Sequence, residues 1–493
     1  MPRLLLLAAL LAAPLVHAQT RVAPGGLAGS ETRFTLDADG DRLVIGVPEV
    51  DGGRGAVYIA ERTGDPAQPW RIGVRVVRSQ GAAGDAFGSG VHLVGDDLFV
   101  SAPGVRIPNP QGVLIPTGEI LHFRFNTGVQ AWLQQATIGP DDIQRLFGTE
   151  IAYGGGGFLA VRDGTRGDAV YVFEQIDAST WTRAATLDAP VTNSNFGTTL
   201  AMDDSTLVVG APFAGDGQAY VYDYDDGADT WGLTATFSRG GVSTPVSVPR
   251  TRGLASQFGS AVAIDGSRIA VGAPVDFDND LNTFTGSVVT FARNEVGAWA
   301  RTAALYGSGG TSNGRLGESV AIEGLRVVAG AVAEGDGAVY VFDGAVNPDN
   351  GAVTWSETDR RTQPTGTPGR FGSAVATAAR APVGLAPQDR AAFVFDDLAV
   401  STDARPEADL RLSAPTPNPA SGAATLALVL DAPQRVRATL HDVLGRTVAT
   451  VHDGPASGTL ALAVEAGRLA PGLYLVRVAG ERFAATQTLT VVR

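Results

Sequence analysis

The chain has 493 residues, a formal net charge of −14, and neither cysteine nor lysine. The acidic balance argues against nucleic acid and anionic membrane surfaces as partners. Without cysteine no disulfide can form, so packing alone must hold the fold, and the length suffices for one large domain and a small second one.

The first eighteen residues have the pattern of a secretory signal peptide. A short basic start at Met1-Pro2-Arg3 is followed by an apolar run over 4–16, and Val16-His17-Ala18 offers a small-residue cleavage site before Gln19. The run is too short to span a membrane as a mature anchor, and no later stretch is long and apolar enough to form a transmembrane helix. We therefore predict a signal peptide over 1–18 and no membrane span.

A sequence motif with fixed internal spacing then recurs seven times. In its clearest copy Phe258-Gly259 is followed fourteen residues later by Gly272-Ala273-Pro274. The copies begin at residues 32, 87, 147, 196, 258, 316 and 371, so the period is 49 to 62 residues. A period of this size predicts a repeat architecture.

Each copy has room for four strands, which the unit 258–307 places near 260–265, 268–274, 286–293 and 299–305. Its second and third strands are almost continuously apolar, which is typical of a sheet buried on both faces. We therefore predict an all-β protein with a seven-bladed β-propeller over 19–402. The last blade would take its fourth strand from 398–402 or from the segment before Thr32. A tryptophan opens the fourth strand in six copies and is expected between adjacent blades: Trp70, Trp132, Trp181, Trp231, Trp299 and Trp355.

A polar linker is expected over 403–411, followed by a small Ig-like β-sandwich over 412–493. Several of its segments alternate apolar and polar residues, as a half-buried strand does. The expected strands lie near 424–430, 436–443, 447–453, 458–465, 472–479 and 483–492.

Two resemblances follow from these residues. Over about 30–400 the chain resembles the FG-GAP repeat family, the blades of the integrin α-subunit head and of many bacterial surface proteins, which implies a seven-bladed propeller. The tail has a set of residues in fixed order: Pro417, Asn418, Pro419, Asp442, Gly445, Arg446, Gly472, Tyr474 and Arg493. With these residues the tail resembles the type A C-terminal sorting domain of the type IX secretion system. That resemblance implies Sec-dependent passage, export across the outer membrane, and contact with the type IX machinery.

No catalytic or metal-binding motif stands out. The five histidines lack metal-ligand spacing, and no Gly-x-Ser-x-Gly elbow occurs. FG-GAP repeats often bind Ca²⁺ through a loop that is too short in every copy here. The segment 276–280 starts like an EF-hand loop, but Leu281 replaces its glycine and Ser287 its bidentate glutamate. We predict no metal and no cofactor. A pair of catalytic carboxylates stays an alternative, because such pairing is spatial.

Loop lengths carry the remaining functional signal. The long connections 104–117, 238–257 and 275–285 would all fall on one face of a propeller, and such insertions often form a binding surface. Drift of unconstrained loops explains the lengths equally well. The candidate binding residues are Arg106, Arg239, Arg250, Arg252, Asp276, Asp278 and Asp280.

Three functions remain open. The leading one is an exported, non-enzymatic propeller that binds a protein or glycan partner at the cell surface or outside the cell. The alternative is an exported hydrolase with its site in the axial pocket or on the long-loop face, and the third is a structural surface-layer component. Convergent carboxylates or a Ser/His pair in a pocket would favour the enzyme, and a face with arginines and aromatics would favour binding.

Overall fold

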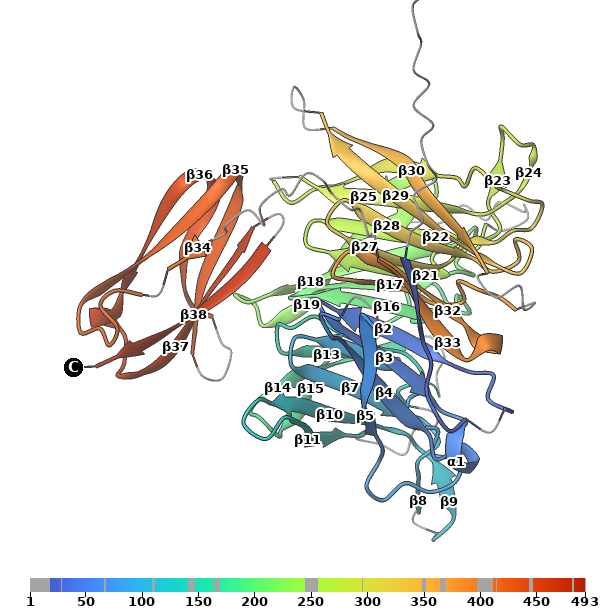
Figure 1. Cartoon of the computed structure of the whole chain (residues 1–493), viewed down its shortest axis with the longest axis horizontal. Helices are drawn as coiled ribbons and strands as arrows, with labels where there is room; N and C mark the ends of the chain where they lie inside the picture. Colours follow the sequence, from blue (N-terminus) through green and yellow to red (C-terminus); the bar gives the residue numbers. More distant parts are fainter. Residues whose placement is uncertain are drawn as a thin grey trace, which may run out of the picture.

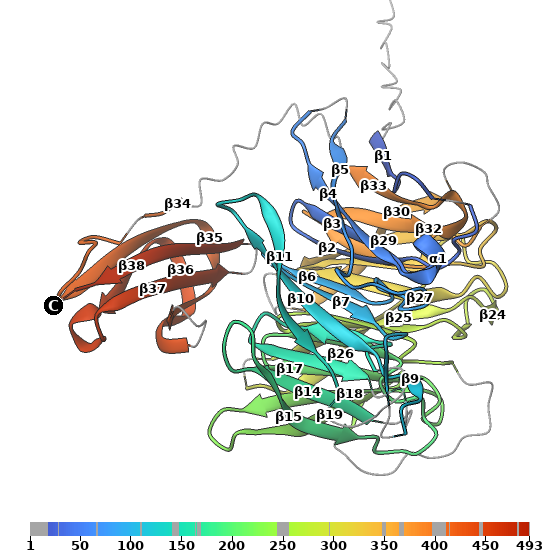
Figure 2. The ribbon, with the colours of Figure 1, turned by 90° about the horizontal axis from the view of Figure 1, so that it is seen from below.

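The computed structural model is all-β, with almost no helix (Figures 1 and 2). It describes residues 18–396 and 411–492, except for residues 28, 66–67, 109–110, 141–146, 163, 165–168, 244–255, 295, 348–351, 364–368, 414, 443–446 and 481–482. No helix in these ranges is long and apolar enough to cross a membrane.

Seven antiparallel sheets of four or five strands occupy the described part of 18–396. In the fifth of these sheets, which corresponds to the unit 258–307, each strand lies within one residue of the bounds predicted from the sequence. Sheet one contains β2 (Thr35–Asp39), β3 (Arg42–Val47), β4 (Ala56–Arg62) and β5 (Trp70–Val76). Sheet two contains β6 (Val91–Val94), β7 (Asp97–Ala102), β10 (Glu119–Asn126) and β11 (Ala131–Ile138). Sheet three contains β12 (Ile151–Tyr153), β13 (Phe158–Arg162), β14 (Ala169–Gln175) and β15 (Trp181–Asp188). Sheet four contains β16 (Thr199–Asp203), β17 (Thr206–Ala211), β18 (Gln218–Asp225), β19 (Thr230–Ser238) and β20 (Gly241–Ser243).

The remaining three sheets follow the same order, and the last of them is completed by the N-terminal strand. Sheet five contains β21 (Ala261–Asp265), β22 (Arg268–Ala273), β25 (Ser287–Arg293) and β26 (Trp299–Leu305). Sheet six contains β27 (Leu316–Glu323), β28 (Arg326–Ala331), β29 (Ala338–Val346) and β30 (Val353–Thr362). Sheet seven contains β31 (Val375–Ala378), β32 (Ala381–Ala386), β33 (Ala391–Asp396) and β1 (Ala18–Val22).

The first strands of the seven sheets contact one another in a closed circuit. The order is β2, β6, β12, β16, β21, β27 and β31, and β31 returns to β2. Seven hydrophobic clusters lie between consecutive sheets, each built from two of them, and the cluster between sheets seven and one closes the series. Each of the seven sheets therefore packs against the sheet before it and the sheet after it, and sheet seven packs against sheet one.

The recurring glycines sit where two sheets approach most closely. A Cβ added to Gly272 in sheet five would lie 2.0 Å from the carbonyl oxygen of Gly317, which opens sheet six. Gly317 itself has φ +90°, a conformation that favours glycine. The same approach joins Gly210 to Gly259 and Gly330 to Gly372. The glycine that ends the motif in one sheet thus contacts the glycine that begins the motif in the next sheet, which explains why the two recur together.

Tryptophans pack across the same boundaries. The Trp181 ring of sheet three lies 5.5 Å from the Phe99 ring of sheet two, and Trp299 of sheet five lies 5.7 Å from Phe237 of sheet four. Trp231 contacts Phe158 in the same way at 5.2 Å. These rings occupy the predicted positions between neighbouring units, where aromatic edges and faces add to the buried area.

The N-terminal segment completes sheet seven. β1 runs antiparallel to β33, with Gln19 opposite Phe395 and Val22 opposite Ala392. Of the two candidates for the missing strand, the segment before Thr32 therefore supplies it. The other candidate, 398–402, lies outside the described residues.

The tail forms one further sheet with the order β34 (Arg411–Leu412), β35 (Ala423–Asp442), β37 (Gly472–Gly480) and β38 (Phe483–Val491), and β36 (Thr447–Glu465) pairs with β35. Four of the six expected strands merge into the two long strands β35 and β36, whose pairing resumes after an irregularity between Leu430 and Gln434. The other two, expected near 472–479 and 483–492, are present as β37 and β38. A two-layer Ig-like arrangement stays a prediction. The remaining short elements are α1 (Val50–Gly53), η1 (Pro387–Asp389), η2 (Ala466–Arg468), β8 (Arg106–Pro108), β9 (Leu114–Pro116), β23 (Phe277–Asp278) and β24 (Thr283–Phe284).

Candidate functional site

Two of the three long connections fold into hairpins. β8 pairs with β9 within 104–117, and β23 pairs with β24 within 275–285. Figures 1 and 2 show both hairpins on the side of the sheets where α1 lies. The β8–β9 hairpin carries Arg106 and exposes apolar side chains at its tip: Ile107, Val113 and Leu114 are 43%, 57% and 61% exposed.

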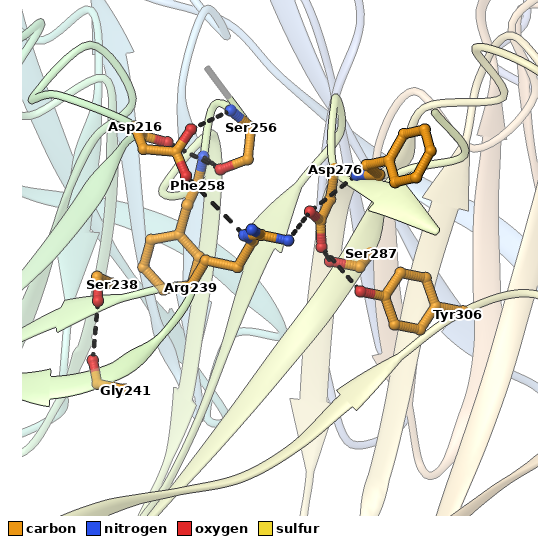
Figure 3. A network of polar contacts seen from close by, with 10 residues as sticks. Asp216, Ser238, Arg239, Gly241, Ser256, Phe258, Asp276, Ser287 and Tyr306 are labelled. Carbon is orange, nitrogen blue, oxygen red and sulfur yellow. Dashed lines mark hydrogen bonds and ion pairs between the residues drawn. The ribbon is translucent and has the colours of Figure 1, made fainter. Parts of the chain in front are cut away.

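The third connection begins with β20, which adds a fifth strand to sheet four, and continues into residues outside the described part of the chain. Arg250 and Arg252 fall there. Arg239, in the turn between β19 and β20, points towards the next sheet (Figure 3). One of its Nη atoms lies 2.7 Å from Asp276 Oδ1, and its Nε lies 3.9 Å from Asp216 Oδ2. The predicted arginine and aspartate therefore pair with each other.

Asp276 is the centre of a buried network, with only 1% of its side chain exposed. Its Oδ2 accepts hydrogen bonds from the hydroxyls of Ser287 at 2.7 Å and Tyr306 at 3.1 Å (Figure 3). Burial, followed by the charge of Asp276, raises the pKa of Tyr306 to about 12. Because the carboxylate is enclosed by these donors, it positions the loop at the start of the β23–β24 hairpin.

Asp216 extends this network to the connection before sheet five. Its Oδ1 accepts a hydrogen bond from the Ser256 backbone N–H at 2.7 Å, and the Ser256 hydroxyl donates to the Asp216 carbonyl at 2.8 Å. Ser256 is 3% exposed. Two carboxylates and one guanidinium thereby hold together three connections on one face, and sequence reasoning did not include Asp216.

The acidic run 276–280 does not converge on a common point. Asp278 is nearly buried, and its Oδ1 accepts the backbone N–H groups of Asp280 at 2.8 Å and Leu281 at 3.2 Å, which closes the turn between β23 and β24. Asp280 is exposed. Among the described residues, no three histidine, aspartate or glutamate side chains are grouped so that they could hold a metal ion.

The two histidines of the repeat region lie within sheet two and contact carboxylates. His122 is 2% exposed, its Nε2 lies 2.7 Å from Asp97 Oδ1, and its ring stacks on Phe99 at 4.4 Å. His92 Nδ1 lies 3.4 Å from Asp37 Oδ2. The position of His122 is that of a core histidine.

An open hollow of about 780 Å³ lies on the same face, at the junction of sheets seven, one and two. The sequence analysis could not identify this hollow, because its lining comes from segments more than three hundred residues apart in the chain. The lining includes three arginines, one carboxylate and several hydroxyl groups; Arg33, Arg370, Arg390, Glu31, Thr32, Ser89 and Ser373 are among them.

The sorting-motif residues gather at one end of the tail sheet. The Asn418 side chain donates to the Thr488 carbonyl and accepts from the Thr490 N–H, both at 2.8 Å, so it pairs with β38 much as a strand would. Pro417 and Pro419 flank it and are exposed. Asp442 on β35 lies opposite Tyr474 on β37, and Gly472 lies opposite Val491 on β38. Gly445, Arg446 and Arg493 lie outside the described residues.

Comparison with protein families matches two parts of this architecture. The FG-GAP repeat model matches residues 181–222 and 299–342, and the secretion system C-terminal sorting domain model matches residues 416–492. The chain contains FG-GAP repeats and a C-terminal sorting domain. No curated protein matched the chain. The sorting domain links the protein to type IX secretion and supports its export to the cell surface or beyond.

Each FG-GAP match starts at a tryptophan and ends in the third strand of the following sheet. The first runs from Trp181 on β15 to Tyr222 on β18, and the second from Trp299 on β26 to Phe342 on β29. The family unit therefore straddles two sheets and includes the boundary between them. That boundary is where the tryptophans and the close glycine contacts lie.

Proposed function

We propose that the protein is an exported seven-bladed β-propeller that acts at the cell surface or outside the cell by binding a protein or glycan partner, without catalysing a reaction. A signal peptide over 1–18, of which residues 1–17 lie outside the described part, would direct it to the Sec system. The sorting domain over 412–493 would then carry it across the outer membrane, and an Ig-like fold is proposed for it.

The closed circuit of first strands and the seven clusters between consecutive sheets support the propeller. Radial repetition of four-stranded sheets leaves only short, protected edges, so each unit is stable only with two neighbours. The pairing of β1 with β33 supplies the closure that such a ring needs.

The observation that carries the binding role is the β8–β9 hairpin, which exposes Ile107, Val113 and Leu114 at the end of a rigid sheet. Apolar side chains presented together on a rigid scaffold are typical of contact sites. The hydrolase alternative needs convergent carboxylates or a Ser/His pair in a pocket. The lining of the hollow has one carboxylate, Glu31, against three arginines, which favours binding of an anionic or polar group.

The test is binding of the purified chain to washed cells of the source organism. We expect saturable binding that is lost when Ile107 and Leu114 are both replaced by serine, with the melting temperature unchanged. Val129→Ser is the matched control: it is 64% exposed, but lies in the turn between β10 and β11, at the other end of the same sheet. If the double variant bound as well as the unchanged chain while Val129→Ser did not, the contact would lie on the opposite face.

A further inference from the structure

The hollow at the junction of sheets seven, one and two has a position that the repeats themselves define. Thr35 begins β2, Ser89 comes two residues before β6, and Ser373 two residues before β31. These are the first strands of three consecutive sheets, and they belong to the circuit that surrounds the centre of the ring. The hollow therefore lies where the chain enters the innermost strands, beside the ring axis.

Repeat equivalence shows which side chains here are unusual. Arg370 and Arg315 occupy the same place, directly before the Phe-Gly or Leu-Gly step, and both have positive φ. The Arg315 guanidinium is neutralised by Glu318, with Nε and Nη2 at 2.9 Å and 2.7 Å from Oε2. In sheet seven the residue equivalent to Glu318 is Ser373, so Arg370 lacks this local partner. The nearest carboxylate oxygen that the described residues give Arg370 is Oε1 of Glu318, 3.8 Å from its Nη2, and 66% of the Arg370 side chain is exposed.

The Ser373 hydroxyl is also unusual among its equivalents. Ser89 and Ser260 each donate to the carbonyl three residues earlier, at 2.8 Å. The hydroxyl oxygen of Ser373 is buried and has no hydrogen-bond partner within the described residues. A buried polar group without a partner costs free energy, which a ligand that supplies the hydrogen bond would recover.

The other two arginines add donors that the protein leaves largely unused. Arg33 is exposed, and the described residues give its guanidinium no hydrogen bond or ion pair, since only its backbone N–H binds Glu49. Arg390 donates one hydrogen bond to the Gly29 carbonyl at 2.8 Å. Each guanidinium has five N–H donors in a planar fork that suits carboxylate, sulfate and phosphate oxygens. The three arginines make this hollow locally basic on a chain of net charge −14, which suits an anion.

We propose that this hollow binds an acidic oligosaccharide, with carboxylate or sulfate groups on the arginines and sugar hydroxyls on the polar lining. A single carboxylate would fill little of the hollow, whereas Thr32, Ser89 and Gln388 offer further hydrogen-bonding groups, as a sugar chain requires. The open mouth allows a polymer to continue beyond the site. The proposal rests on the binding role above and names a ligand class for it.

The experiment is titration of the purified full chain with a short oligogalacturonate, with its methyl ester, with a heparin-derived oligosaccharide and with poly-glutamate. Oligogalacturonate or the sulfated oligosaccharide should bind with an affinity that falls as salt rises, and the better of the two identifies the anionic group. The methyl ester should not bind. Absence of binding by both acidic oligosaccharides, or equal binding of the ester, overturns the proposal, and tighter binding of poly-glutamate makes the ligand an acidic peptide instead.

Variants separate the site from general electrostatics. Arg33→Gln with Arg370→Gln should weaken binding at least about tenfold, and Ser373→Ala should weaken it several-fold. Glutamine already stands at the place equivalent to 370 in sheet five, as Gln257 with φ +56°, so the fold should tolerate it. Arg301→Gln removes the same charge from an exposed arginine on β26, outside the lining of the hollow, and should leave affinity unchanged. An equal loss in that control would refute the site.

These outcomes are independent of the β8–β9 hairpin. The Ile107→Ser, Leu114→Ser variant should bind oligogalacturonate normally, even where it no longer binds cells. If the protein binds cells but no saccharide, the proposal for the hollow is refuted and the proposed function stands. If it binds saccharide but not cells, the proposal for the hollow stands and the proposed contact through the β8–β9 hairpin is refuted.

Discussion

Replacement of Gly272 by alanine tests whether the contacts between repeats hold the ring together. The added Cβ would lie 2.0 Å from the carbonyl oxygen of Gly317, 2.9 Å from its carbonyl carbon and 3.1 Å from its Cα. Carbon and oxygen atoms normally approach to about 3.3–3.6 Å even in close C–H···O contacts. All three obstructing atoms belong to the backbone, so no side-chain rotation relieves the clash, and sheet six must move away from sheet five by more than 1 Å, roughly the difference between these distances.

Overpacking of this kind costs about 1–3 kcal/mol where side chains can adjust. Because only backbone can move here, we expect a loss near the upper end, about 3 kcal/mol in the free energy of unfolding. Urea unfolding followed by tryptophan fluorescence measures it, since all six tryptophans lie in the repeats. Gly232→Ala is the control: nothing lies within 4 Å of its added Cβ, so the variant should match or slightly exceed the parent in stability. If Gly272→Ala unfolds within about 0.5 kcal/mol of the parent, the close contact does not hold the sheets.

Three further outcomes are expected. Trp181→Ala should lower the free energy of unfolding by about 3 kcal/mol, the lower end of the range for a buried tryptophan, because the partly buried ring packs between sheets two and three; a loss below about 1 kcal/mol in urea titration would contradict this packing. Truncation after Thr402 should leave one cooperative unfolding transition but retain the protein in the periplasm of its host; fractionation that finds it outside would refute the sorting role. Burial, opposed by the Arg162 charge and the Leu200 backbone N–H, raises the pKa of Glu150 from 4.5 to about 8. The folded chain thus binds this proton more tightly than the unfolded chain, so stability should fall as pH rises from 4.5 to 8, and Glu150→Gln should show a smaller fall in urea midpoint across that window.

The strands of the repeats and their boundaries could be predicted from the sequence, because the same pattern of apolar strands and turns recurs in each copy. The connection between β21 and β22 shows this: the strands predicted at 260–265 and 268–274 leave room only for a tight turn, and Gly266 there has φ +54°. Asp265, directly before this glycine, has a role that one repeat does not reveal. Its Oδ2 accepts the backbone N–H of Gly324 in the next sheet, and Asp39 binds Gly95 in the same way. Such a contact depends on how two units are placed, which no pattern within one unit encodes.

The candidate residues show the same limit. Loop length placed Arg239 and Asp276 on one face, but opposite charges on two loops say nothing about whether they meet a partner or each other. The 2.7 Å contact between them shows that a large part of the charge on each is used within the protein. In the hollow the contrast lies between two equivalent residues: Arg315 is hydrogen-bonded to Glu318 at 2.9 Å, whereas Arg370 lies 3.8 Å from the same carboxylate, a difference that the sequence does not reveal.

The closure of the ring connects the fold to the two ends of the chain. The closing strand β1 begins at Ala18, which lies opposite Asp396, so the predicted cleavage before Gln19 would remove the first of its five paired residues and keep the other four. The strand that β1 pairs with, β33, ends at Asp396. The predicted leader cleavage would therefore shorten β1 without removing it from sheet seven. Because residues 19–22 still pair with β33, the last sheet would keep four strands after the leader is lost.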